Sequence, residues 1–160
     1  MPDTQQAGFA KLLAMIDAMD VAMLTTEDEG GNLRSRPMAT QKAEDGVFWF
    51  FTSADSPKVD EIEGRSHVNL SYAAPDAEIY VSVSGLARLV RDREKMRELW
   101  TEDVRRWFPQ GLDSPDIALL EVRMTHAEYW DVDKRQMREL LDAGASREEL
   151  EKATDHQKLS

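Results

Sequence analysis

The sequence predicts a mainly β fold, a small antiparallel β-barrel of about six strands with helices added outside it. Two observations favour this class. Short apolar or alternating segments follow one another at hairpin spacing, separated by turns, and helical periodicity is confined to a few segments instead of alternating with every strand. The chain has 160 residues, of which 41% are hydrophobic, so it is long enough for one domain with a real core.

The first part of the chain predicts a helix followed by three strands. Residues 3–20 repeat apolar side chains at helical spacing, and Asp3 or Thr4 suits the N-cap. The turn after the first strand contains the glycine pair of "EDEGGN". The strands are expected at residues 21–26, 33–41 and 47–52.

The second part begins with a short helix at residues 56–65. Ser56 is a good N-cap and Pro57 suits the first helical position. The elements expected after it are strands at 67–73 and 78–90, a helix at 92–108 and a last strand at 117–132. These elements belong to one predicted domain, residues 1–132.

Residues 133–160 form a highly charged tail, for which the sequence predicts one or two helices. Ser146 and Glu149 have the spacing of a capping box. Such a helix could dock on a partner subunit or remain in solvent.

Composition excludes several classes of function. The chain has 20 Lys and Arg against 31 Asp and Glu, a formal charge of −11, which argues against a nucleic-acid partner. It has no cysteine, so disulfides, thiolate catalysis and Cys-ligated zinc are excluded. We see no signal peptide and no stretch near the roughly 18 apolar residues of a membrane span, so we expect a cytoplasmic protein without membrane contact.

Common catalytic signatures are missing. The sequence has no Gly-rich dinucleotide loop, Walker loop, HExxH or GxSxG motif. The histidines, His67, His126 and His156, share no metal-ligand spacing, so we predict no metal site. No residue is nominated as a catalytic acid or base.

Two neighbouring stretches, "RSRPMATQ" and "FWFFTSADSPK", carry the residues most suited to a ligand. Pro37 cannot donate to a sheet ladder, so its strand is expected at an edge or a bulge. Strand alternation places Arg36, Met38 and Thr40 on one side and Gln41 on the other.

The second stretch ends in small polar residues and a lysine. Thr52 and Ser56 offer hydroxyl groups, Lys58 offers a positive charge, and the start of a helix favours an anion. Together with Arg36 these residues suit a phosphate group. The residues by themselves leave a second interpretation open, in which Ser56 is a plain helix cap and Lys58 a surface residue.

The order of the motifs adds to this evidence. "RSRPMATQ", a turn, "VFWFFTSADSPK", "HVNLSYA" and "YVSVSGLARLV" together resemble the FMN-binding split-barrel proteins related to pyridoxamine-5′-phosphate oxidase. "RPM", "FFT…S.K" and "AEYWD" are most similar to the general-stress-protein branch. The resemblance covers residues 9–132 and implies a six-stranded antiparallel FMN-binding split barrel that pairs with a second copy, with FMN at the dimer interface.

The resemblance also implies which residues bind the cofactor. Lys58 is the expected phosphate ligand, Tyr80 falls near a position that reaches the flavin from the partner chain, and Trp130 would cover the ring. Many relatives have lysine in place of Gln41 and arginine or lysine in place of Pro57. The implied FMN-binding residues are Arg36, Pro37, Met38, Ala39, Gln41, Phe51, Thr52, Ser56, Lys58, Tyr80 and Trp130.

We therefore expect a homodimeric FMN-binding protein of the general-stress type that acts as a flavin-dependent oxidoreductase, with FAD as the alternative cofactor if its adenylate extends into solvent. Three alternatives stay open: a flavin carrier or sensor without turnover, an enzyme like pyridoxamine-phosphate oxidase, and a β-barrel interaction module without flavin. The arginine-rich C-terminal signature of true pyridoxamine-phosphate oxidases is missing, which argues against the vitamin-B6 activity. The aromatic residues that we expect a dimer interface to help cover are Trp49, Trp100, Trp107, Phe108 and Trp130.

Overall fold

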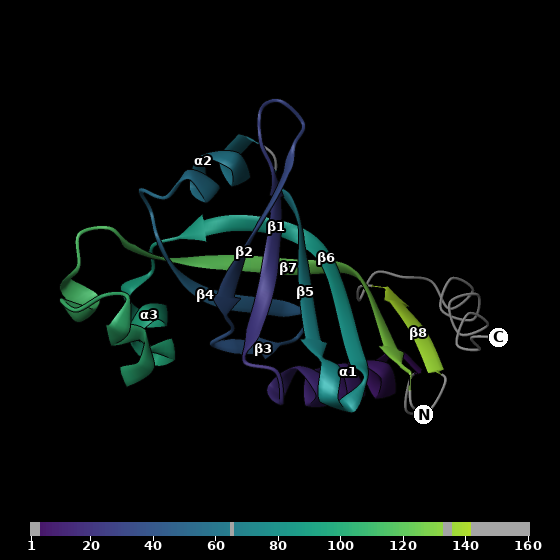
Figure 1. Ribbon diagram of the computed structural model, residues 1–160. Coiled ribbons are helices and arrows are strands. Elements are labelled where there is room, and N and C mark those ends of the chain that lie inside the picture. Colours follow the sequence, from purple (N-terminus) through teal and green to yellow (C-terminus); the bar gives the residue numbers. More distant parts are fainter. Residues whose placement is uncertain (1–3, 65, 133–135, 142–160) are drawn as a thin grey trace.

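The computed structural model describes residues 4–64, 66–132 and 136–141 and has the mainly β fold that the sequence predicts (Figure 1). The strands are β1 (Val21–Glu27), β2 (Leu33–Ala39), β3 (Lys42–Glu44), β4 (Val47–Ser53), β5 (His67–Ala74), β6 (Ile79–Val90), β7 (Ile117–Asp131) and β8 (Gln136–Leu141). The helices are α1 (Thr4–Asp17), α2 (Pro57–Gly64) and α3 (Arg93–Leu99), with short 3₁₀ helices η1 (Pro75–Ala77), η2 (Glu102–Arg106) and η3 (Gly111–Asp113).

The described strands form one curved, antiparallel sheet (Figure 1). Its order is β2-β1-β5-β6-β7-β4-β3, and β8 pairs with β7 off this path. The sheet curls so that β2 and β4, far apart in this order, come close. The Gln41 amide donates to the Trp49 carbonyl at 2.9 Å and so extends the β3–β4 hairpin toward β2. The barrel class is confirmed, although the described residues form eight strands and not six.

The two additional strands lie where the sequence predicted a turn and a helix. Strand β3 forms in the expected turn after β2 by pairing with the start of β4. Strand β8 forms because β4 covers β7 only as far as Arg123, which leaves residues 126–131 of β7 available for pairing. The helical prediction is therefore wrong for residues 136–141, while residues 133–135 and 142–160 lie outside the described residues. The predicted boundary at residue 132 stays a prediction.

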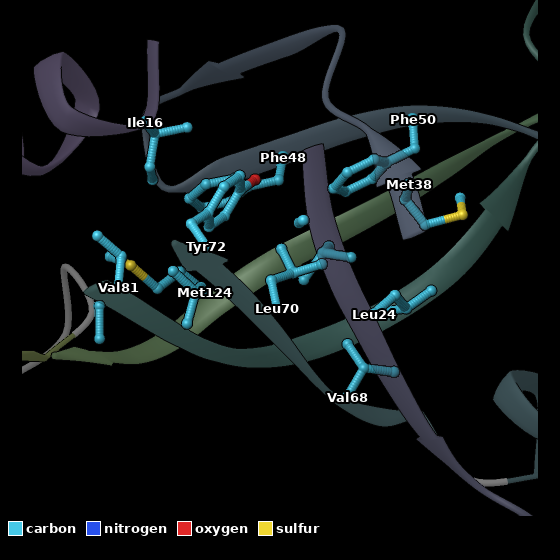
Figure 2. Packing of buried hydrophobic residues seen from close by; sticks show 14 of the residues in the cluster. Ile16, Leu24, Met38, Phe48, Phe50, Val68, Leu70, Tyr72, Val81 and Met124 are labelled. Atoms are coloured by element: carbon cyan, nitrogen blue, oxygen red, sulfur yellow. The ribbon is translucent and has the colours of Figure 1, made fainter. Parts of the chain in front are cut away.

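The main hydrophobic core fills the inside of the curved sheet (Figure 2). It combines alternate residues of β1, β4, β5, β6 and β7, of which Phe48, Phe50 and Tyr72 are the largest. Helix α1 covers one end of the sheet and adds Leu12 and Ile16. Burying one such side chain contributes about 1.5–3 kcal/mol.

A second cluster packs on the other face of β4. Leu99 of α3 and Phe108, which lies between η2 and η3, join Leu119 of β7 there, with Trp49 and Phe51 packed against them. Strand β4 is therefore covered on both faces, which explains why its sequence is an almost continuous apolar run. None of the described helices is long and apolar enough to cross a membrane.

We expect Gly85→Ala to destabilise the fold, because β6 and β7 shift register between Ser84 and Gly85 and the two backbones approach closely. An added Cβ would lie 2.5 Å from the Arg123 carbonyl oxygen. The free energy of unfolding in urea should fall by about 1–3 kcal/mol. Gly30→Ala is the control, since its nearest contact is the Asn32 side chain at 3.1 Å in an exposed turn, and should cost clearly less. Equal losses in the two variants would contradict this interpretation.

Candidate functional site

Strand β2 stands at one edge of the sheet and presents alternate residues to its two faces. The strand order of the sheet confirms the edge position that was predicted from Pro37. Arg36 is half-buried and Met38 is buried, whereas Pro37 and Ala39 are exposed on the opposite face. Strand β2 therefore carries one half-buried cation, Arg36, on the face that it turns toward the core.

The Arg36 guanidinium is held by a hydrogen-bond network that joins β1, β2 and α2. Its Nη1 donates to Thr26 Oγ1 at 2.6 Å and to the Leu24 carbonyl at 3.3 Å. Its Nη2 donates to Glu61 Oε2 at 3.2 Å. The Thr26 hydroxyl donates to the same carboxylate, and Arg34 Nη1 pairs with its other oxygen at 3.3 Å. The Glu61 side chain is only 8% exposed, so this carboxylate anchors α2 on the β1–β2 hairpin.

Lys58 places a second positive charge near Arg36. Its Nζ donates to Ser56 Oγ at 2.9 Å, directly before α2 begins. Burial, and then the charge of Arg36, lowers the pKa of Lys58. Within the described part of the chain Lys58 has no carboxylate partner, so the fold holds two like charges close together without neutralising both.

Thr52 adds a polar atom whose hydrogen-bonding capacity is unused. It lies on the same face of β4 as Phe48 and Phe50 and is 4% exposed, and its Oγ1 has no partner among the described residues. Leaving a buried hydroxyl unpaired costs about 1–3 kcal/mol. The described chain thus leaves one unused donor at the end of β4, four residues before Ser56.

Two other predicted site residues lie toward the second cluster. The Phe51 ring meets Trp100 edge to face at 5.7 Å between centroids. Gln41 donates from Nε2 to the Ala39 carbonyl at 3.3 Å and accepts from Thr101 Oγ1 at 3.5 Å. The structure therefore places Phe51 and Gln41 on the α3 side, with no hydrogen bond from either to Arg36 or Lys58 within the described residues.

Tyr80 and Trp130 lie on the outer face of the sheet, where β6 and β7 pair. They occupy opposite positions in the register, and Tyr80 is 38% exposed. No hydrogen bond links either residue to the Arg36–Lys58 pair in the described ranges. A single chain thus brings together Arg36, Ser56 and Lys58, but not the two outer aromatic residues.

Sequence reasoning missed three members of the network: Thr26, Arg34 and Glu61. Each came from an element that was correctly expected, but none stands out in its own segment. One weak signal was available, because Glu61 follows Lys58 by three residues on a predicted helix and so lies on the same side of it. Among the described residues no group of three or more His, Cys, Asp or Glu side chains could hold a metal ion.

Comparison with known proteins identifies a family. The sequence model described as "Pyridoxamine 5′-phosphate oxidase like" matches residues 8–152. Protein bli-3 of Neurospora crassa is 31% identical over 119 residues, which cover 68% of this chain. The match spans 57% of the length of that relative, so the chain corresponds to a little over half of it.

Solved structures share the fold. A protein related to general stress protein 26, from Clostridium acetobutylicum, has a TM-score of 0.74 at 18% identity, covering 84% of this chain and 94% of the other. The general stress FMN/FAD binding protein of Xanthomonas citri has a TM-score of 0.66 at 28% identity, covering 75% and 85%. A general stress family protein of Xanthomonas campestris has a TM-score of 0.68 at 25% identity, covering 90% and 93%.

We expect Thr52→Val to stabilise the ligand-free protein by about 1 kcal/mol, because it replaces an unpaired buried hydroxyl with a methyl group of similar size. Thr26→Val is the matched control, since Thr26 is 1% exposed and its hydroxyl is bonded to both Arg36 and Glu61. That variant should lose about 1–3 kcal/mol. Urea unfolding measures both, and a loss of stability in Thr52→Val would show that its hydroxyl is already satisfied.

Proposed function

We propose that this chain, which belongs to the pyridoxamine 5′-phosphate oxidase-like family, is an FMN-binding protein of the general-stress type that works as a flavin-dependent oxidoreductase. Family membership favours a flavin, and the structure must supply a place for it. The residues around Arg36 and Lys58 suit this purpose.

The observation that carries the proposal is the pair of close cations in an acidic protein. Lys58 keeps its ammonium near Arg36 although burial and the like charge both lower its pKa. A chain with a net charge of −11 has many carboxylates that could have neutralised Lys58. An anion bound between the two cations would relieve their repulsion, and arginine and lysine are the usual ligands of phosphate.

The donor set fits the terminal phosphate of FMN. Arg36 retains donor capacity beyond its bonds to the protein, and Lys58, Ser56 and the unpaired Thr52 hydroxyl add further donors. The sequence has no Gly-rich loop to cradle a pyrophosphate. We therefore propose FMN, with FAD as the alternative if its adenylate extends into solvent. The relative in Xanthomonas citri is itself described as an FMN/FAD binding protein.

When bound, the flavin supplies the redox chemistry, and the protein supplies binding, orientation and electrostatics. In this assignment Arg36, Thr52, Ser56 and Lys58 bind the phosphate. The rest of the cofactor lies along the edge strand β2 and the residues after it, next to Pro37, Met38, Ala39 and Gln41. Phe51 shapes the wall on the α3 side. We assign no catalytic acid or base.

A second copy of the chain completes the proposed site. Strand β1 exposes Val21 (51%) and Met23 (42%), and Ala39 and Pro37 of β2 stand opposite them in the register. This uncharged face suits a subunit interface. This face supports a dimer better than the five aromatic residues that the sequence suggested for the interface. Of these, Phe108 is buried and only Trp107 is exposed, at 76%.

The homodimer would bring the outer aromatic residues to the flavin. Tyr80 and Trp130 share the outer face of the sheet with Val21 and Met23, so an interface on this face could carry them to the site of the partner. The C-terminal tail, the domain boundary and the cytoplasmic location stay predictions.

We expect Lys58→Ala to weaken FMN binding about 10- to 150-fold, the loss of one charge-assisted hydrogen bond worth roughly 1.5–3 kcal/mol. Riboflavin has no phosphate and should bind the variant and the parent nearly equally. Calorimetric titration with both flavins at low salt measures this. Lys42→Ala is the control, since it removes a lysine whose charge is already paired with Glu44. Equal FMN affinity in Lys58→Ala and the parent would return Lys58 to the role of a surface residue.

We expect the flavin-bound protein to have twice the chain mass of 18.2 kDa in light scattering at micromolar concentration. Met23→Lys would place a charge on the proposed interface and should produce monomers with weakened FMN binding. Ala10→Lys, on an exposed position of α1, should leave the mass unchanged. A monomer that binds FMN tightly would rule out the shared site.

Oxidoreductase activity has its own test. A purified protein that absorbs near 450 nm and is bleached by NAD(P)H under anaerobic conditions would support a reductase. Persistent colour with every nicotinamide donor would point instead to a flavin carrier or to another electron donor.

A further inference from the structure

Helix α2 carries a lysine and a glutamate that are placed to pair with each other but do not. Lys58 and Glu61 are three residues apart on one side of the helix, the spacing of an intrahelical ion pair. Lys58 Nζ instead bonds to Ser56 Oγ at 2.9 Å. Glu61 accepts a hydrogen bond from Thr26 and forms ion pairs with Arg34 and Arg36, all from the β1–β2 hairpin. The carboxylate is thus saturated by groups outside its own helix.

The consequence is a local charge that contrasts with the rest of the protein. Arg34 and Arg36 pair with Glu61, while Lys58 bonds to Ser56 and feels the charge of Arg36, so these four side chains carry a net charge of +2. A phosphate monoester carries about −1.5 to −2 at pH 7. The cluster therefore matches the charge of one phosphate monoester, and Glu61 is the residue that sets this balance.

We propose that Glu61 is a specificity-determining residue, an internal counter-ion that limits how strongly the site prefers a phosphorylated flavin to an unphosphorylated one. This inference rests on the proposed function and deepens it. Glu61 stabilises the flavin-free fold by neutralising the half-buried Arg36. The same charge weakens the attraction of the site for phosphate and occupies one donor of Arg36. Its contributions to stability and to cofactor affinity therefore have opposite signs.

Two effects of removing Glu61 compete, and their sizes decide the expected direction. Arg36 would lose one anchor, but Nη1 keeps its bonds to Thr26 and to the Leu24 carbonyl, so the side chain stays largely ordered. The phosphate would gain from the loss of a nearby negative charge, and this gain is large for groups shielded from water. The electrostatic effect should win, so FMN should bind more tightly without Glu61.

The test compares Glu61→Gln with the parent protein. At low salt the ratio of the riboflavin to the FMN dissociation constant should rise roughly tenfold, and raised salt should reduce this gain. The melting temperature of the flavin-free protein should fall. Glu63→Gln is the matched control, since it removes an exposed carboxylate from the same helix and should change neither quantity appreciably. A purely structural role for Glu61 would weaken both flavins together and leave the ratio unchanged.

A second variant keeps the test decisive if Glu61→Gln fails to fold. Arg34 is 56% exposed and its only described ion pair is with Glu61, so Arg34→Gln lowers the local charge to +1 with little packing loss. The ratio should then fall several-fold, the opposite direction from Glu61→Gln.

The outcomes separate this inference from the proposed function. A parent protein that binds FMN no better than riboflavin overturns both. A parent that prefers FMN, with a ratio unchanged in Arg34→Gln and unchanged or lowered in Glu61→Gln, overturns the role of Glu61 alone. Opposite shifts of the ratio in the two variants establish it.

Discussion

Strand β4 has to bury both of its faces, and the arrangement of the molecule depends on this requirement. Phe48 and Phe50 point into the main core, while Trp49 and Phe51 pack against the cluster formed with α3. A strand covered on both faces cannot shift its register without exposing large aromatic side chains on one of them. The end of β4, and with it the segment that leads to α2, is therefore held in a fixed place.

That fixed segment carries the proposed ligand-binding groups. Thr52 continues the inward alternation of Phe48 and Phe50, so it is buried even though its hydroxyl finds no partner in the described chain. Four residues later Ser56 precedes α2, and Lys58 follows in its first turn. A well-packed strand thus tolerates an unpaired hydroxyl and a half-buried ammonium at its exit, costs that a stable core can absorb.

Arg34, Arg36 and Lys58 form a small positive region in a protein whose net charge is −11. The Glu61 network ties α2 to the β1–β2 hairpin, so one buried carboxylate both assembles the site and sets its charge. The family pattern often has further cations where this chain has Gln41 and Pro57. Their absence makes Arg36, Lys58 and the residues around Glu61 correspondingly more important for any anion that binds here.

The sequence by itself determined the mainly β class, the edge position of Pro37, the apolar run of β4 and the approximate places of most elements, because periodicity and turn chemistry are local properties. It also singled out Arg36, Thr52, Ser56 and Lys58 as candidates for a phosphate site, since hydroxyl and cationic side chains at a helix start are typical of such sites. Strand β8 could not be foreseen, because its pairing depends on how far β4 covers β7 and not on its own charged sequence.

Only the tertiary structure decided which of the candidate residues meet. It placed Phe51 against Trp100, on the face of β4 opposite Thr52, and left Tyr80 and Trp130 on the outer face of the sheet. It also brought Glu61 to Arg36 across 25 positions of sequence separation. The composition gives the whole chain a formal net charge of −11. The sign of the charge at one site depends instead on the few side chains that the fold brings close together. Coulomb interactions weaken with distance and are screened by solvent, so distant carboxylates contribute little there.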